Sequence, residues 1–436
     1  MKLARKVEVQ PTPTQRRALL QHAGNARWAY NWGLRRKKEA WTARKAALEA
    51  GTPPEAAPKV PTAVDLHREL NALKKLPVEA GGVPWMYEAS KCAPQEALRN
   101  LDTAYKNFFE RVKAGQKPGQ KPGHPRFKSK KSGIGGFTLT GAIQTEERVV
   151  TLPRLGRLRI KPGDHGYLPA GTPVKVSVTE RAGRWFVSVR GPEVEEAAPN
   201  GGPSVGLDLG VVRLVTLSDG AVIENRAALA SEARKLRRKQ KEVSRKQRGS
   251  SNRRKARHRL ARVHARISHV RSDALHKATT AIAKRYGRVC IEDLRVRNMT
   301  RSAKGTVAEP GRNVRAKAGL NRGILDASFA EFRRLLEYKA RLYGCEIVAV
   351  SAAYTSQRCS RCGYVDPNSR RSQAEFRCTT CGYEVHADLN AAVNIHVAGS
   401  CTPETKNACG AAVRPERPRT LRRAVTKQES AVAVAS

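Results

Sequence analysis

The sequence predicts a multidomain α+β protein, and three features of its 436 residues carry that prediction. A first strand at residues 2–10 is followed by helix-forming segments that continue to about residue 114. Short strand-like runs separated by Gly/Pro turns occupy 134–192 and indicate a small β-barrel. From 203 to about 398, strand and helix patterns mix, and four cysteines are inserted near the end. A chain of this length has room for about three domains.

The segment after the first strand is predicted to be helical. Thr12-Pro13-Thr14-Gln15 has an N-cap Thr, Pro at the first helical position and Gln three residues after the cap. Further helices are expected at 64–76 and 90–114, with a Pro/Ala-rich loop at 51–63. The first helix carries a dense aromatic set: Trp28, Tyr30, Trp32 and Trp41. These rings can stack on nucleobases, but packing in the helix core is the favoured interpretation for most of them.

Linkers rich in Gly, Pro or charge are expected at 115–133 and 193–203, on either side of the strand-rich segment. The expected strands are Phe137–Leu139, Val149–Leu152, Leu158–Ile160, Val174–Thr179 and Trp185–Val189. Residues 301–322 are polar with recurring glycines, which indicates a mobile loop and, as one interpretation, a lid. After Gly399 the composition turns polar and Arg/Pro-rich, so 399–436 is predicted to be a disordered tail.

The charge balance points to a polyanionic partner. Lys and Arg total 83 against 38 Asp and Glu, a formal net charge of +45. Self-repulsion of that size favours nucleic acid as the partner. A membrane is not expected, because the chain contains no run of about 18 apolar residues and opens with no signal peptide. Five of the nine cysteines lack partner spacing, which favours a reducing cytosol over a disulfide framework.

Residues 234–271 form a very basic stretch, with seventeen Lys or Arg and one acid, Glu242. Gly249-Ser250-Ser251-Asn252 divides it into a predicted helical hairpin. A charge run is usually a solvated face, but like charges repel along a helix, so a run of one sign favours binding to phosphates. The predicted nucleic-acid contacts are Arg237, Arg238, Lys239, Lys246, Arg253, Arg254, Lys255 and Arg257.

Two cysteine doublets predict a structural zinc site. Cys359-x-x-Cys362 and Cys378-x-x-Cys381 are separated by fifteen residues, and each doublet is followed by Gly. This spacing is typical of two zinc knuckles that share one tetrahedral site. Four thiolates leave no open coordination position, so this Zn²⁺ is not expected to be catalytic.

Three carboxylates lie in or at the end of predicted core elements. Asp208 is inside the apolar run 205–211, the first strand of an expected antiparallel three-strand unit that turns at 218–220. Glu292 ends another apolar strand, and Asp388 opens an apolar helix seven residues beyond the last cysteine. A charged side chain in such a setting is costly unless it is paired or binds a metal.

Each acid also has a structural interpretation, and these stay open. Asp208 is explained as a residue near a turn, Glu292 as a surface acid at a strand end, and Asp388 as an N-cap. Asp293 is the local rival of Glu292. Taken together, the three acids are what a two-metal phosphodiester hydrolase needs, with Mg²⁺ held by carboxylate oxygens.

These motifs resemble those of the TnpB proteins of bacterial transposons. The resemblance covers nearly the whole chain, and its motifs include Gly206-Leu207-Asp208-Leu209-Gly210, Ile291-Glu292-Asp293-Leu294, the four-cysteine ribbon and Asp388-Leu389-Asn390-Ala391-Ala392-Val393-Asn394-Ile395. The resemblance implies an RNase H-like (RuvC) nuclease domain with catalytic residues Asp208, Glu292 and Asp388. The family often has an acid two residues before the last of these, where this chain has His386.

The resemblance also implies a domain order. The expected domains are a wedge barrel from 1–12 and 134–195, a helical recognition domain at 13–133, a nuclease domain at 203–350 and 385–398, and a zinc ribbon at 351–384. The implied activity is Mg²⁺-dependent, RNA-guided cleavage of DNA for a mobile element. The implied partners are a guide RNA and double- and single-stranded target DNA, in the cytoplasm of a bacterium and at its nucleoid. Two alternatives remain: a miniature type V CRISPR effector, and a DNA-binding regulator of transposition that does not cleave.

Overall fold

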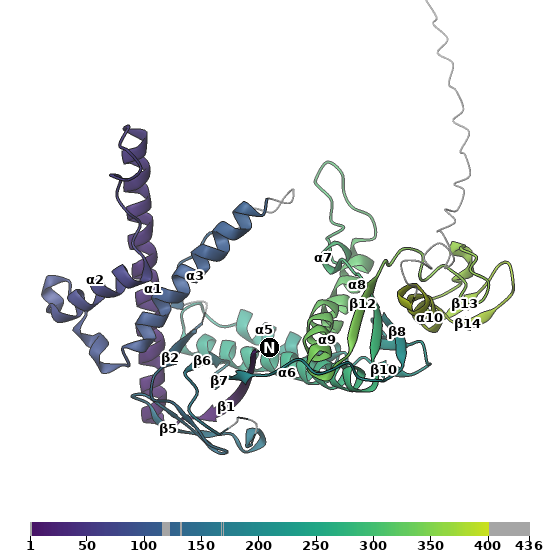
Figure 1. Cartoon of the computed structure of the whole chain (residues 1–436), viewed down its shortest axis with the longest axis horizontal. Coiled ribbons are helices and arrows are strands. Elements are labelled where there is room, and N and C mark those ends of the chain that lie inside the picture. Colours follow the sequence, from purple (N-terminus) through teal and green to yellow (C-terminus); the bar gives the residue numbers. More distant parts are fainter. Residues whose placement is uncertain (1, 116–122, 131–132, 167, 169, 401–436) are drawn as a thin grey trace, which may run out of the picture. The chain divides into compact units, whose positions relative to one another are not determined.

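The computed structural model describes residues 2–115, 123–130, 133–166, 168 and 170–400 (Figure 1). The disordered tail expected at 399–436 therefore falls almost wholly outside the described residues, as does part of the linker expected at 115–133. Residue contacts divide the chain into two compact units. Unit 1 is Met1–Glu195 with Glu232–Ser268, and unit 2 is Glu196–Ser231 with His269–Ser436. Both contain helices and sheets or parts of them, so the predicted mixed α+β class is confirmed.

The helices of unit 1 begin where the sequence predicts. Strand β1 (Lys2–Gln10) leads into α1 (Pro13–Glu49), and the Thr12 and Gln15 side chains form the expected capping box. A second capping box, made by Thr62 and Asp65, opens α2 (Ala63–Lys75), and α3 spans Cys92–Lys113. Short 3-10 turns precede α3: η1 (Val78–Ala80) and η2 (Pro84–Glu88).

A seven-stranded antiparallel sheet forms the rest of the N-terminal part of unit 1. Its order is β2-β6-β7-β1-β5-β4-β3, so the first strand of the chain lies in the middle. The strands are β2 (Gly136–Thr140), β3 (Gln144–Thr145), β4 (Val149–Leu152), β5 (Gly156–Ile160), β6 (Lys175–Arg181) and β7 (Arg184–Glu193). The five expected strands are present, and only the two-residue β3 was missed. Among the described strand pairings none joins β2 to β3, so closure into a barrel stays a prediction.

One hydrophobic core joins the helices of unit 1 to this sheet. Leu19 and Leu34 of α1, Leu98 of α3 and Val187 of β7 are all fully buried members of the same cluster. The helical segment and the strand-rich segment were expected as separate domains from their different sequence patterns. Their shared core makes them one packed body.

The basic stretch forms the predicted helical hairpin, α5 (Ala233–Ser244) and α6 (Ser251–Arg285). Gly249 between them has a positive φ of 88°. Arg253 closes the turn, because its guanidinium donates to the backbone carbonyls of Val243 and Lys246 at the end of α5. Residue contacts assign α5 and the first part of α6 to unit 1.

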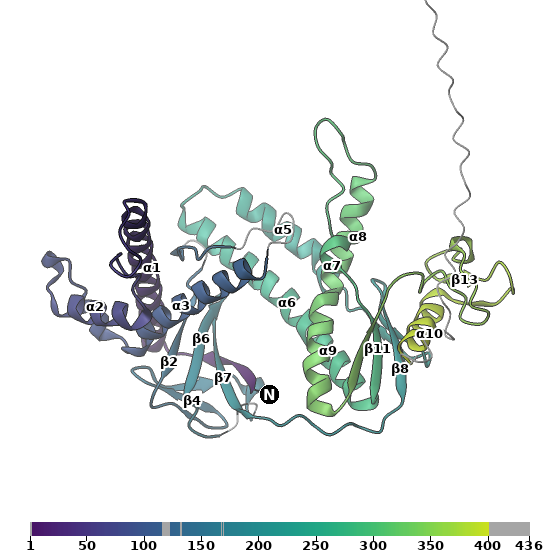
Figure 2. The same cartoon turned by 45° about the horizontal axis from the view of Figure 1, so that its top comes forward.

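Unit 2 is built on a five-stranded sheet of order β10-β9-β8-β11-β12 (Figure 2). Strands β8 (Ser204–Leu209), β9 (Arg213–Leu217) and β10 (Val222–Glu224) form the expected antiparallel unit. Strands β11 (Arg288–Glu292) and β12 (Glu346–Val350) then join β8 in parallel. The remaining elements of unit 2 are α4 (Ala228–Ser231), α7 (Val296–Met299), α8 (Val314–Ala327), α9 (Phe329–Tyr343), η5 (Pro367–Ser369), β13 (Glu375–Arg377), β14 (Glu384–His386) and α10 (Ala387–Ser400).

The two faces of this sheet are covered by different helices. Val289 and Ile291 of β11 pack with Phe332 and Leu336 of α9 on one face. Cys290, between them, points to the other face and packs with Ile395 of α10. Figure 2 shows α9 and α10 on opposite sides of the strands.

Helix α10 approaches β8 very closely at Gly206. A Cβ atom at this position would lie 2.0 Å from the carbonyl oxygen of Ala392 and 2.5 Å from the backbone nitrogen of His396. Because side chains alternate along a strand, Asp208 is on the same face as Gly206 and therefore faces α10. The glycine in Gly206-Leu207-Asp208 thus has a packing role that brings this helix to the acid.

The prediction of a mobile loop at 301–322 is wrong for the second half of that segment, because α8 begins at Val314. The glycines suggested a loop, but Gly323 lies in the helix where a Cβ would come within 2.6 Å of Val211 Cγ1. It permits close packing and does not break the helix. No helix among the described residues is long and apolar enough to cross a membrane.

Replacing Gly206 by Ala is expected to destabilise unit 2 by about 3 kcal/mol, because the new methyl group meets backbone atoms that cannot rotate away. Chemical denaturation followed by circular dichroism would measure the loss. Gly201→Ala is the matched control, since a Cβ there meets no heavy atom within 4 Å and the variant should stay near wild type. Equal stability of the two variants would contradict the close approach of α10.

Candidate active site

The three predicted acids come from three elements that meet at one edge of the unit 2 sheet. Asp208 is the penultimate residue of β8, and Glu292 is the last residue of β11. These strands are parallel, and the register pairs Ile291 with Leu207, which sets the two acids side by side. Asp388 is the second residue of α10, the helix that covers this face.

The pKa of Asp208 responds to the charges of the other two carboxyl groups. Burial, and after it the charges of Glu292 and Asp388, together raise the pKa of Asp208 from 3.8 to about 7. Burial also raises the pKa of Glu292, against the opposing effect of a hydrogen bond from Thr355. Two partly buried acids with raised pKa values at one edge of a sheet are typical of a functional site.

Asp388 is held by two basic side chains. Arg370 Nη2 lies 3.6 Å from Asp388 Oδ1, and its charge lowers the pKa of Asp208. His386 Nδ1 accepts a hydrogen bond of 3.2 Å from the backbone N–H of Asp388. This bond satisfies a free N–H group in the first turn of the helix, so His386 acts as a helix cap. The second carboxyl oxygen of Asp388, Oδ2, lies 3.9 Å from His386 Nδ1.

Asp293, the sequence rival of Glu292, lies elsewhere. Its carboxylate is exposed and forms an ion pair with Arg333, with an N–O distance of 2.6 Å. Successive residues of a strand point to opposite faces, so Glu292 and Asp293 cannot both face Asp208. The geometry therefore favours Glu292.

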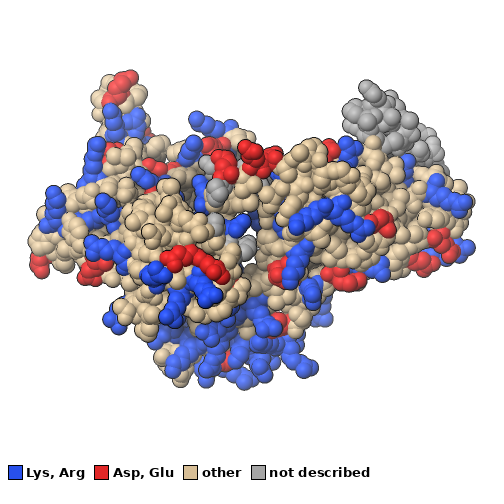
Figure 3. Space-filling view, turned by 60° about the horizontal axis from the view of Figure 1, so that its bottom comes forward, with Lys and Arg blue, Asp and Glu red and all other residues tan. Residues whose placement is uncertain are grey.

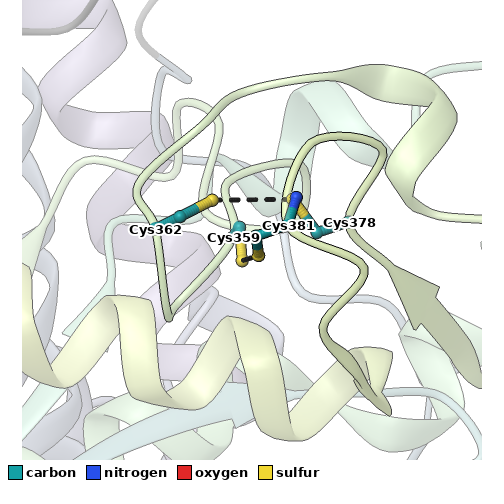
Figure 4. A group of neighbouring side chains, drawn as sticks. All are labelled: Cys359, Cys362, Cys378 and Cys381. Carbon is teal, nitrogen blue, oxygen red and sulfur yellow. Dashed lines mark hydrogen bonds between the residues drawn. The ribbon is translucent and has the colours of Figure 1, made fainter.

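The four cysteines form a second site in the same unit (Figure 4). Their sulfur atoms all lie within 4.8 Å of one another, and among the described residues they are the group close enough to hold a metal as they stand. Cys359 Sγ is 3.8 Å from Cys381 Sγ, and Cys362 Sγ is 3.5 Å from Cys378 Sγ. A tetrahedron with Zn–S bonds of ~2.3 Å has S–S edges of about 3.8 Å. The three acids do not form such a compact group.

Each cysteine doublet makes the turn that its glycine allows. Gly363 and Gly382 have φ values of 76° and 67°, and each N–H donates to the carbonyl of the first cysteine of its doublet. The backbone N–H of Cys381 also donates to Cys378 Sγ at 3.4 Å. Burial opposes ionisation of Cys378, but the backbone N–H groups outweigh it and lower the pKa of this thiol to about 7. This favours the thiolate, the form that binds metals, at Cys378, whereas burial raises the pKa of Cys359.

Two asparagines, which the sequence analysis gave no role, tie α10 to the first cysteine turn. Asn390 donates to the carbonyl of Arg358 and accepts from the N–H of Ser360. Asn394 donates to the carbonyls of Thr355 and Arg358. Two Asn residues in an otherwise apolar helix are a sequence signal that could have predicted this role, because buried amides need hydrogen-bond partners.

Thr355 and Arg370 were also missed, and the sequence carries no signal for either. Thr355 belongs to the segment after β12, and its hydroxyl donates to Glu292. Arg370 belongs to the segment between the two cysteine doublets. The cysteine-containing segment therefore contributes side chains to two of the three acids.

The basic hairpin presents most of its predicted contact residues to solvent. Six of the eight are exposed: Arg237, Arg238, Lys246, Arg254, Lys255 and Arg257. The other two have partners, since Lys239 pairs with Glu242 and Arg253 closes the turn. Figure 3 shows Lys and Arg gathered at the lower part of that view, with few acids among them.

The aromatic residues of α1 mostly pack in the core. Tyr30 and Trp32 are 6% and 8% exposed, and Trp28 packs partly buried against the same cluster. Trp41 is the exception at 55% exposed. The preference for core packing is confirmed.

Family models match three parts of the chain. Residues 174–303 match a model described as a probable transposase, and 329–395 match the TNB domain of Cas12f1-like proteins. Residues 1–46 match a model described as a helix-turn-helix domain. In the structure these residues form, from Lys2 on, strand β1 and most of the unbroken helix α1.

Several curated proteins are similar to the chain over most of its length. One is "Putative RNA-guided DNA endonuclease InsQ" of Escherichia coli strain K12, 36% identical over 77% of this chain and 80% of that protein. A "Putative RNA-guided DNA endonuclease" of Streptomyces pristinaespiralis is 34% identical over 96% of this chain and 93% of its own. A CRISPR-associated endodeoxyribonuclease Cas12f1 of Sulfoacidibacillus thermotolerans is 40% identical over only 18% of each chain. A solved Cas12f1–sgRNA–target DNA complex covers 91% of this chain and 99% of its own at 15% identity, with a TM-score of 0.31.

Replacing Asp208 by Asn is expected to stabilise the metal-free protein at neutral pH. The pKa of Asp208 is raised from 3.8 to about 7 in the folded state, so the folded protein holds this proton more tightly than the unfolded chain. Its contribution to the free energy of unfolding is therefore present at about pH 4 and is lost as pH rises to about 7. The neutral variant should gain on the order of 3 kcal/mol over wild type at about pH 8 and little at about pH 4.

Urea unfolding in EDTA at both pH values would measure this gain. Asp293→Asn is the matched control, because that carboxylate is exposed and paired with Arg333. It should show no gain at either pH. A gain for Asp208→Asn of the same size at both pH values would mean that the charge of Asp208 is not its cause.

Proposed function

This chain belongs to the TnpB family of RNA-guided DNA endonucleases, and from that premise we propose that it cleaves DNA phosphodiester bonds under the direction of a guide RNA for a bacterial mobile element. The observation that carries the proposal is the meeting of Asp208, Glu292 and Asp388 at one sheet edge in a chain of net charge +45. The positive charge favours binding of two nucleic-acid partners, and the three acids can hold the metal ions that hydrolysis needs.

We assign the unit 2 sheet with α10 to the RNase H-like (RuvC) nuclease domain. An antiparallel β10-β9-β8 unit extended by parallel β11 and β12 supports this assignment. Within unit 1, residues 1–12 and 134–195 would be the wedge and 13–133 the recognition segment, and within unit 2 residues 351–384 would be the zinc ribbon. In this assignment the wedge and recognition segments bind nucleic acid, and the nuclease domain cuts it.

The three acids fit Mg²⁺. Carboxylate oxygens are the ligands that this ion prefers, and the burial and neighbouring negative charges that raise the pKa of Asp208 to about 7 are effects that a bound cation would offset. Asp208, Glu292 and Asp388 would hold two ions, which when bound supply an activated water and charge for the leaving oxygen. Thr355 orients Glu292 by a hydrogen bond, and His386 fixes the backbone at Asp388. Arg370 already sets one positive charge beside the acids, where it can bind a phosphate oxygen.

The four sulfurs fit Zn²⁺, because their separations match the edges of a zinc–thiolate tetrahedron. Cys359, Cys362, Cys378 and Cys381 would hold this ion in a closed site. Its role is structural: it fixes the turns that carry Arg358 and Ser360, whose backbone groups bind α10. Zinc would thereby help to hold Asp388 against the sheet.

We assign the exposed Lys and Arg of the hairpin to nucleic-acid binding. Arg237, Arg238, Lys246, Arg254 and Lys255 have no acid within their own stretch except Glu242, which is already engaged by Lys239 and Arg259. Their charges are available for phosphates, of the guide RNA or of target DNA.

The main experiment is purification from cells that carry the gene with its native flanking DNA, followed by sequencing of the bound RNA. A discrete RNA that ends in variable sequence, and that directs Mg²⁺-dependent cleavage of a matching DNA, is the expected result. An RNA from a neighbouring repeat array would instead identify a miniature CRISPR effector. Heterogeneous RNA and no cleavage would favour a DNA-binding regulator.

Asp208→Ala, Glu292→Gln and Asp388→Asn are each expected to lower cleavage by at least about a thousandfold while leaving RNA binding intact, because metal-binding acids act in the chemical step. Asp293→Asn is the control and should cleave within a few fold of wild type. Single-turnover cleavage and filter binding on the same preparations would measure both properties. If Asp208→Ala lost RNA binding together with cleavage, the acid would be structural.

Cys378→Ser is expected to remove bound zinc and to destabilise the ribbon strongly, since a structural four-thiolate site contributes on the order of 10 kcal/mol to its small fold. Metal analysis and thermal unfolding would measure the two effects. Cys92→Ser is the control, because Cys92 lies outside the cluster and donates to the carbonyl of Thr140, a bond that Ser can keep. Unchanged thermal stability of wild type after chelation would count against the zinc site.

A further inference from the structure

We propose that a cavity on helix α1 of unit 1 binds a single unstacked nucleotide of a single-stranded nucleic acid. The proposal rests on the proposed function, which supplies both RNA and single-stranded DNA as partners. The cavity has a volume of about 500 Å³, within the range of sites that hold small ligands. It lies wholly within unit 1 and contains none of the acids or cysteines discussed above.

One face of α1 forms the floor of this cavity. The residues at successive turns are Gln21, Gly24, Asn25, Trp28, Asn31, Trp32 and Arg35, spaced by three or four positions. That spacing puts them in one stripe along the helix. Trp85 of η2 and Phe127 complete the lining. The stripe mixes rings, amides and a guanidinium group, and Asn25 and Trp32 form its buried part.

The aromatic rings are already arranged as a platform. Trp28 stacks on Trp32, with ring centroids 6.0 Å apart and an interplanar angle of 9°, and meets Trp85 edge-on at 5.8 Å. These contacts fix the indoles before any ligand arrives, which lowers the entropy lost on binding. Phe127 is 53% exposed, with Lys38 Nζ 4.9 Å from its ring centroid. A nucleobase can stack against such rings whatever its identity.

The charged groups at the cavity suit a phosphate. Arg27 is held in place by a 3.2 Å hydrogen bond from its Nη1 to the carbonyl of Ile134, and most of its donors remain. Arg35 has a side chain that is 63% exposed and only a 4.0 Å contact with Glu39. Gln21 of the lining donates a hydrogen bond to the carboxylate of Glu88. The cavity therefore offers the cations Arg27 and Arg35 for a phosphate.

A second cavity of about 310 Å³ continues from the first, because Arg27 and Phe127 line both. Lys128 lines this second cavity, and its backbone N–H and carbonyl are each hydrogen-bonded to Asn31. The chain after Phe127 is thus fixed to the helix stripe. Two adjoining cavities that share a cation and a ring fit a strand that enters one and leaves by the other.

Gly24 is the residue that keeps the floor open. It lies in the middle of a helix, where Gly costs about 1 kcal/mol relative to Ala. A Cβ atom there meets no heavy atom within 4 Å, and its φ is not positive, so neither packing nor backbone conformation requires glycine. What the missing side chain provides is free space beside Trp28. A larger residue at 24 would fill the cavity without disturbing the core.

The test uses Gly24→Leu to fill the cavity and Gly24→Ala as the matched control. Binding of labelled single-stranded oligo-U and oligo-dT to the full chain would be measured at high salt, which weakens the phosphate contacts of the basic hairpin. Gly24→Leu should lose about tenfold in affinity, or ~1.4 kcal/mol, which is within the range for one stacked base. Gly24→Ala should bind as wild type, and both variants should be folded, because the site is open.

Ultraviolet crosslinking of the guide-loaded wild-type protein, with peptide mapping, would identify the source of the nucleotide. A crosslink to Trp28, Trp85 or Phe127 before DNA is added assigns the cavity to the guide RNA. A crosslink that forms only with target assigns it to the displaced DNA. Unchanged oligonucleotide affinity in Gly24→Leu, with no crosslink at these rings, overturns the inference.

The two proposals fail separately. If wild type shows guided cleavage and Gly24→Leu does not change oligonucleotide binding, nucleotide binding at the cavity is rejected. The nuclease assignment is then unaffected. Loss of oligonucleotide binding in Gly24→Leu from a protein that takes no discrete guide supports the cavity and rejects the nuclease assignment. Asp208→Asn should keep the crosslink, because it changes only the acids of unit 2.

Discussion

The close approach of α10 to β8 is the constraint on which the candidate active site depends. The helix can lie this near to the sheet because residue 206 has no side chain, and at its other end Gly399 lies against Cys290 in the same way. Gly206 on the strand and Gly399 on the helix therefore both allow the short distance between α10 and the sheet. That distance decides whether Asp388, at the start of the helix, reaches the two acids on the strands.

The four-cysteine segment also helps to hold α10 and Glu292 in this arrangement. Its first turn is bound to α10 by two buried asparagines, Asn390 and Asn394, while Thr355 ahead of that turn binds Glu292. A metal that fixes the turn would thus fix both the helix and the strand-end acid. A metal bound there would be coupled to the geometry of the acids through hydrogen bonds to the backbone, which tolerate little displacement. The ribbon and the acids are best regarded as one structural system within unit 2.

Unit 1 differs from unit 2 in how its apolar and charged residues are distributed. Its helices and its antiparallel sheet share one apolar core, and its polar and cationic groups are left at the surface of α1 and along α5 and α6. Exposed arginines and lysines there have few acids to pair with, so their charge is free to bind phosphates. The cavity on α1 adds aromatic rings to that charge. The binding proposed for unit 1 and the hydrolysis proposed for unit 2 would thus depend on different residue types.

Elements whose signals are local could be predicted from the sequence. Capping at Thr12, the turn at Ser218–Gly220, the strands between Gly/Pro turns and the spacing of Cys359–Cys381 depend on neighbours in the chain, and the structure has them as expected. The sequence also identified Asp208, Glu292 and Asp388 as candidates, because an acid in an apolar element is unusual. Only the tertiary structure chose Glu292 over Asp293, turned 314–322 into a helix, and brought Thr355, Arg370 and the amides of α10 to the site. Those outcomes depend on contacts between residues far apart in the chain, and a single sequence carries no record of them.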